Sequence, residues 1–97
     1  MEKEGEAVLF ELPHIRLVRR VSGLYCLIVE DTELNDYVED FLWDDFEYAT
    51  TSVTLQSSGL PVYTNCFGPG FPVEPLLESL RRLDAREVEQ VYRRNKE

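Results

Sequence analysis

Cysteine and histidine are scarce in this 97-residue chain, which has two cysteines and one histidine. Two cysteines are too few for the disulfide framework of a small secreted domain. Cys26 lies in an apolar run, where a free thiol commonly serves as a small buried hydrophobe, so we expect it and Cys66 to be reduced thiols. No sequence signature links the single histidine, His14, to a nearby nucleophile, which argues against a catalytic role.

Long hydrophobic runs are also missing. The longest, at residues 24–29, has six residues, whereas a bilayer crossing requires roughly 20. The N-terminus begins Met-Glu-Lys-Glu-Gly-Glu, which has the wrong charge for a signal peptide. We therefore expect a cytoplasmic protein without membrane contact, folded as one domain over residues 1–97 with residues 1–6 frayed.

Lysine and arginine are absent from residues 30–47, which carry nine carboxylates. The whole chain has 19 acids and 10 bases, so the other residues carry ten of each and this segment accounts for the formal net charge of −9. A local field of this sign attracts a basic partner and repels phosphate groups. Direct binding of nucleic acid is therefore not expected.

Hydrophobic periodicity gives the expected helices and strands. Two β-rich runs, 15–21 and 24–30, flank Ser22-Gly23 and predict a hairpin. Residues 53–56 and 62–65 alternate like two half-buried strands. A second amphipathic helix is expected over 73–83 and a third from Asp84, which forms a capping-box pattern with Glu87.

The most regular apolar stripe predicts an α-helix over residues 32–44, capped by Asp31 or Thr32. Its members are Leu34, Tyr37, Val38, Phe41 and Leu42. The order of strands and helices indicates an α+β domain, with a mostly antiparallel sheet of about four to five strands and two to three helices packed on it.

The outer face of this helix is acidic at a cost to local stability. Asp36 with Asp40, and Asp40 with Asp44, are like-charge pairs one turn apart, and each such pair destabilises a helix by about 0.2 to 0.5 kcal/mol. The carboxylates are either solvated, neutralised by arginines of the same chain, or matched by a basic partner. If the helix continues through Asp44, Trp43 is exposed among them as an interface anchor; if it ends near Leu42, the indole folds over the core.

The charge pattern favours a non-enzymatic protein-binding domain. In charge and size the chain is similar to nuclease inhibitors, toxin-neutralising immunity proteins and DNA-mimic proteins, although no motif assigns it to one of them. The expected partner is a basic protein such as a nuclease, a toxin or a nucleic-acid-binding protein, and no catalytic residue, metal site or cofactor is expected. The predicted partner-binding residues are Asp36, Glu39, Asp40, Trp43, Asp44, Asp45 and Glu47.

Two alternatives remain open at this point. The domain self-associates, so that the acidic helix of one copy meets arginine-rich elements of another in a homo-oligomer. Otherwise it is a small enzyme or ligand-binding domain built around Cys66, because this thiol precedes a Gly- and Pro-rich loop that leads into a helix.

Overall fold

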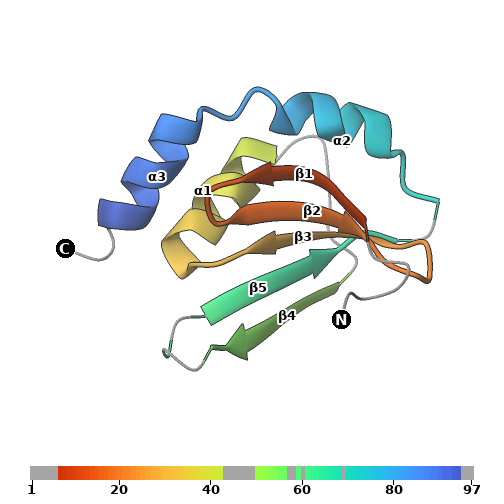
Figure 1. Ribbon diagram of the computed structural model, residues 1–97, viewed down its shortest axis with the longest axis horizontal. Coiled ribbons are helices and arrows are strands. Elements are labelled where there is room, and N and C mark those ends of the chain that lie inside the picture. The colour runs from red at the N-terminus through yellow and green to blue at the C-terminus, as the bar shows by residue number, and fades with distance from the viewer. Residues whose placement is uncertain (1–6, 43–49, 57–58, 60, 69, 95–97) are drawn as a thin grey trace.

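An antiparallel sheet forms the centre of the molecule, with strand order β1-β2-β3-β5-β4. The computed structural model describes residues 7–42, 50–56, 59, 61–68 and 70–94, and within these ranges it contains five strands and three helices (Figure 1). The predicted α+β class is confirmed. In chain order the elements are β1 (Ala7–Leu12), β2 (Ile15–Arg19), β3 (Tyr25–Val29), α1 (Thr32–Leu42), β4 (Thr50–Leu55), β5 (Pro61–Cys66), α2 (Val73–Leu80) and α3 (Ala85–Arg94).

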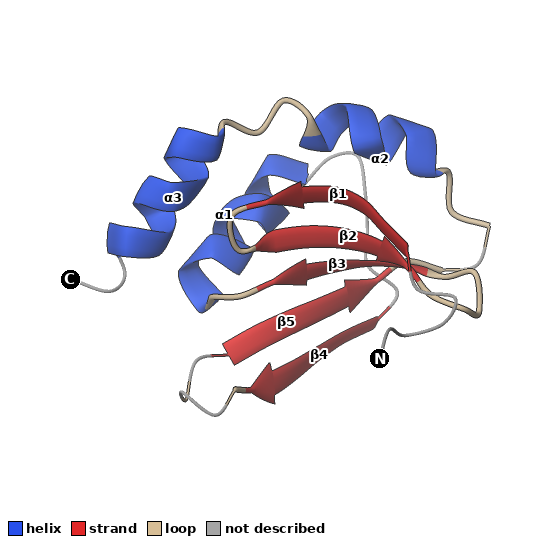
Figure 2. Cartoon of the chain, in the orientation of Figure 1, coloured by secondary structure: helices blue, strands red, loops and turns tan. Residues whose placement is uncertain are grey.

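The main core lies between the helices and one face of the sheet. The apolar stripe predicted for α1 is the face that packs inward, since Leu34, Val38 and Leu42 are buried. Side chains from β2 and β3 meet them from the sheet, and α2, α3 and Phe67 complete the cluster. Figure 2 shows the three helices in blue against the red sheet, with β4 at its lower edge. The buried members from the sheet are Ile15, Leu17, Leu27 and Val29.

Two acidic side chains cap helices as the sequence predicts. The buried carboxylate of Asp31 accepts a hydrogen bond from the Leu34 backbone N–H at 3.0 Å, which satisfies one of the free donors at the start of α1. Asp84 accepts from the Arg86 backbone N–H at 2.8 Å in front of α3. In a complete capping box the Glu87 side chain would accept a hydrogen bond from the Asp84 backbone N–H. Glu87 instead accepts a hydrogen bond from the Tyr37 hydroxyl on α1.

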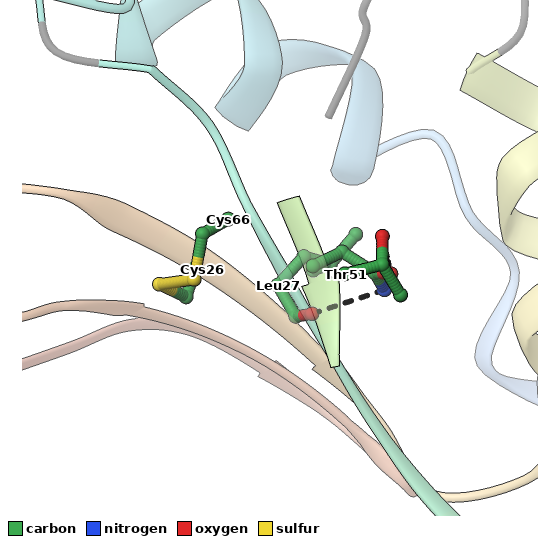
Figure 3. Close-up of a disulfide and its surroundings, with 5 residues drawn as sticks. Cys26, Leu27, Thr51 and Cys66 are labelled. Carbon is green, nitrogen blue, oxygen red and sulfur yellow. Dashed lines mark hydrogen bonds between the residues drawn. A yellow bond between two sulfur atoms is a disulfide. The ribbon is translucent and has the colours of Figure 1, made fainter. Parts of the chain in front are cut away.

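A buried amide joins the helices to the sheet. Asn65 on β5 is fully buried, and its side-chain N–H groups donate to the Leu27 carbonyl at 3.2 Å and to Asn35 Oδ1 at 2.9 Å. Its own Oδ1 accepts from the Thr51 hydroxyl at 3.0 Å. Figure 3 shows Thr51 and Leu27 close together beside the disulfide, and the dashed line marks a hydrogen bond to Leu27. The network thus connects α1, β3 and β5 in the core to the exposed edge strand β4.

The strands predicted at 53–56 and 62–65 exist, but only one of them is half-buried. Every residue of β4 is exposed, whereas β5 is intermediate or buried at every residue. The reason is position in the sheet: β5 lies between β3 and β4, while β4 is an edge strand. No helix among the described residues combines the length and apolar character needed to cross a lipid bilayer.

Candidate functional site

The outer face of α1 carries carboxylates that form no ion pair with the part of the chain that the structure describes. Asp36, Glu39 and Asp40 are exposed on the side of the helix opposite its buried stripe. Neither these three nor Glu33 forms an ion pair with any residue that the structure describes. Three of the seven residues predicted to bind a partner are therefore exposed to solvent and have no ion-pair partner among the described residues.

Part of this acidic face forms one wall of a groove. The groove lies between α1 and α3 and has a volume of about 660 Å³. Its α1 wall contributes three carboxylates and one phenol, while α3 contributes one apolar and one basic side chain. The lining residues are Glu33, Asp36, Tyr37, Asp40, Val91 and Arg94. With three acids and one base, the groove keeps a negative charge beside a partly apolar surface.

Tyr37 fixes the spacing of the two helices at this groove. Its hydroxyl donates to Glu87 Oε1 on α3 at 2.8 Å, and its ring packs against the core. The pKa of Tyr37 is raised above its ordinary value because burial disfavours the phenolate and because the hydrogen bond and negative charge of Glu87 favour the neutral phenol. Asp84 adds a smaller effect of the same sign.

We expect the Glu87→Gln substitution to lower the pKa of Tyr37 toward 10.0, because it removes the nearby negative charge. Because the pKa of Tyr37 is higher in the folded than in the unfolded protein, its protonation contributes to the free energy of unfolding. This contribution is complete at pH values below the unfolded-state pKa, and it is lost as the pH rises through the folded-state pKa. Tyrosinate absorbance during alkaline titration measures the change, and subtraction of the Tyr37→Phe curve isolates this residue from the other four tyrosines. An unchanged Tyr37 titration would show that Glu87 does not set its ionisation.

The arginines expected as internal counter-charges lie mostly elsewhere. Arg16 Nη1 is 3.7 Å from Glu30 Oε2, and Arg93 pairs with Glu89 one turn earlier on α3. Arg94 lines the groove but forms no ion pair with a described residue. Glu30, which directly follows β3, therefore has an arginine partner within the chain, whereas the groove carboxylates have none among residues 7–42, 50–56, 59, 61–68 and 70–94.

His14 lies in the turn between β1 and β2 rather than in a catalytic arrangement. Its ring stacks on Tyr92 of α3, with centroids 3.6 Å apart. Nδ1 is 3.7 Å from Glu30 and Nε2 is 3.6 Å from Glu89, so the ring lies between two carboxylates. Its φ of +67° is rare for a residue with a side chain. These contacts hold the β1–β2 turn against α3, and none of them involves a hydroxyl or thiol nucleophile.

The expectation of reduced thiols is wrong for this structure. Cys26 and Cys66 form a disulfide across β3 and β5, with their Cα atoms 4.0 Å apart (Figure 3). The pairing follows from register, because the two residues are directly opposite each other and therefore point to the same face of the sheet. A sequence separation of 40 residues conceals this proximity. The nucleophile required by the Cys66 enzyme hypothesis is absent from the oxidised form.

The remaining predicted site residues, Trp43, Asp44, Asp45 and Glu47, lie outside the described residues. The described part of α1 ends at Leu42, so the structure does not test the prediction that the helix reaches Asp44 or the alternatives for the indole. Within the described ranges, no group of three His, Cys, Asp or Glu side chains is arranged to hold a metal ion.

Sequence reasoning missed the second wall of the groove. The amphipathic character of residues 88–92 was visible, but periodicity cannot say which helix packs against which, and Val91 and Arg94 follow Asp36 by more than 50 residues. Comparison with known proteins gives no independent assignment: no family model matches the chain, and neither a curated protein nor a solved structure matches it.

Proposed function

We propose that this protein is a small protein-binding domain that receives a basic segment of its partner in the groove between α1 and α3. The observation that carries the proposal is the set of carboxylates on one wall of the groove, none of which has an ion-pair partner among the described residues. Such charges steer the encounter with a basic surface and increase the association rate. The Tyr37 and Val91 side chains supply apolar contact area beside them.

The shape of the groove suits an arginine or lysine side chain. The aliphatic part of such a side chain packs on Tyr37 and Val91, while its cationic end reaches Asp36 or Asp40. Arg94 on the opposite wall disfavours a second cation there, so the basic group of the partner is directed to the α1 side. This asymmetry gives the groove a preferred orientation for the bound segment.

The partner class follows from the spacing of the charges. Carboxylates on successive turns of a helix project about 5 to 6 Å apart, a spacing close to that of phosphates along a nucleic-acid strand. A nuclease, a toxin acting on nucleic acid or another nucleic-acid-binding protein presents a basic surface with matching spacing. A protein whose carboxylates imitate the phosphates of a nucleic acid would act in the cytoplasm as an inhibitor or immunity-type protein of such a partner.

The test is capture of partners from a lysate by the wild-type protein and by the Asp36→Asn/Asp40→Asn variant, with quantitative mass spectrometry. We expect basic proteins captured by the wild type to bind the variant about 3- to 10-fold more weakly, because two partly solvated charge pairs are lost. Removing a like-charge pair also stabilises α1 by about 0.2 to 0.5 kcal/mol, so weaker capture cannot be attributed to unfolding.

The matched control is Glu74→Gln/Glu78→Gln on α2. These two glutamates are also exposed and one helical turn apart, so the control removes the same charge with the same spacing away from the groove. It should retain the capture seen with the wild type. Equal loss in both variants would indicate a nonspecific effect of net charge, and equal retention in both would contradict the proposed groove.

A further inference from the structure

The two edges of the sheet differ in how they are protected. At β1, the register shifts between Val8 and Phe10, and Glu11 adds an exposed charge. Bulges and charges of this kind blunt an edge against pairing with another strand. β4, with the sequence Thr-Thr-Ser-Val-Thr-Leu, has no charged residue, no proline and an unbroken register with β5. Among the described residues, β4 therefore lacks the bulge and the charge that protect β1, in a chain with a formal net charge of −9.

The backbone groups that β4 leaves open can be assigned from the register. Phe67 N–H donates to the Tyr25 carbonyl at 2.9 Å, so the adjacent Cys26 and Cys66 form a non-hydrogen-bonded pair. Cys66 therefore directs its backbone N–H and C=O toward β4, and alternate residues of β5 do the same. Their partners on β4 are Thr50, Ser52 and Thr54.

At the intervening residues of β4, the backbone N–H and C=O groups consequently point away from β5, toward the open edge of the sheet. These are Thr51, Val53 and Leu55. The side chains of Val53 and Leu55 are also 53% and 69% exposed, the largest apolar exposures on this part of the sheet. The open hydrogen-bonding groups and the exposed apolar side chains thus belong to the same residues.

We propose that two copies of this chain associate through β4, antiparallel and centred on Val53, to form one continuous sheet across a two-fold axis. In this register Val53 faces Val53 of the second copy, and Thr51 faces Leu55. Each of these is a hydrogen-bonded pair, because the outward-facing residues meet one another. The surface is separate from the groove between α1 and α3, so the inference does not depend on the proposed function.

A second copy fits this edge because the strand is complementary to itself. On the helix-covered side of the sheet the register brings Val53 against its own copy and Leu55 against Thr51, and on the other side it brings Ser52 against Thr54. β-branched and hydroxyl pairs of this kind stabilise antiparallel strands, and no like charges are opposed. The acidic helix α1 packs over β3 and β5 rather than over the edge, so repulsion between copies is largely screened at about 0.15 M salt, where the Debye length is about 8 Å.

Sedimentation velocity over a range of protein concentrations, at about 0.15 M salt, tests the association. The wild type should show a monomer–dimer equilibrium. Val53→Lys should raise the dimer dissociation constant at least tenfold, since it places two like charges opposite each other on the axis. Val8→Lys is the matched control, because Val8 is 55% exposed on the other edge strand, and it should leave the dimer intact.

Cysteine cross-linking tests the register independently of any loss of folding. Val53→Cys should form an intermolecular disulfide under mild oxidation, because residues in a hydrogen-bonded pair have Cα atoms about 5.5 Å apart. Leu55→Cys should not, since the two copies of residue 55 are separated by four residues along the strands, roughly 13 Å. Non-reducing electrophoresis distinguishes the two, with the wild type as the blank for the native Cys26–Cys66 pair.

Three outcomes would overturn the proposal. A wild type that stays monomeric at every concentration rules out self-association. If the Val53→Lys variant still dimerises and high salt dissociates this dimer, the copies associate through ion pairs between the acidic helix and arginines of the second copy instead. Cross-linking through Leu55→Cys with none through Val53→Cys shows that the strands pair in another register.

Discussion

Reduction of the Cys26–Cys66 disulfide is expected to lower the free energy of unfolding by about 2 to 4 kcal/mol. The bond closes a loop with a sequence separation of 40 residues, and it restricts the unfolded chain far more than the folded one. In the folded protein the two cysteines already lie opposite each other on paired strands, so the sheet keeps its register after reduction. The loss should therefore appear as reduced stability rather than as an altered fold.

Urea unfolding with and without a reductant measures this difference. The Cys26→Ala/Cys66→Ala variant is the control, because a reductant should not change its stability. If the wild type unfolds at the same urea concentration in both conditions, the cross-link does not contribute to stability. A reductant effect of equal size in the double variant would point to some other cause.

Replacement of Asn65 by alanine is expected to destabilise the fold by about 2 to 4 kcal/mol, because buried polar groups that lose their partner cost about 1 to 3 kcal/mol each. The substitution leaves Asn35 Oδ1 without its donor, and the Leu27 carbonyl loses its side-chain donor while it keeps the backbone pairing of β3 with β5. It also creates a cavity at a position with no solvent exposure. Chemical denaturation followed by circular dichroism gives the magnitude.

Thr51→Ala is the control for this prediction. It removes the remaining hydrogen bond to Asn65 at an exposed strand residue, so it should cost only about 0.5 to 1.5 kcal/mol. The Asn35→Ala/Asn65→Ala double variant should be less destabilised than the sum of the single variants, since both break the same hydrogen bond. Additive effects would show that the two amides act independently.

The elements that the sequence predicts well are those determined by local pattern. The stripe of α1 recurs at helical spacing, and three of its five residues, Leu34, Val38 and Leu42, are buried in the structure, whereas Tyr37 is half-buried and Phe41 is exposed at the margin of the stripe. Asp31 and Asp84 cap helices because capping involves neighbours within three residues. The central position of β3 is also readable, because a run without polar alternation indicates a strand that is covered on both faces.

What the sequence does not reveal depends on contacts between distant segments. The alternation of β4 resembles that of a half-buried strand, yet exposure is decided by its place at the edge of the sheet. Cys26 and Cys66 are joined because β3 and β5 are neighbours, and the α3 wall of the groove exists because α3 packs beside α1. The acidic face of α1 could be predicted from charge alone, whereas the groove that it borders could not.

The chain of side-chain hydrogen bonds through Asn65 has a mechanical consequence. Both amide hydrogens and the carbonyl oxygen of this residue are engaged, by α1, β3 and β4 respectively. Asn35 directly precedes Asp36 of the groove, and Thr51 belongs to the outward-facing row of β4. Sliding of α1 that enlarges the groove would stretch the Asn35–Asn65 hydrogen bond, so the network opposes movement of the acidic wall relative to the edge strand.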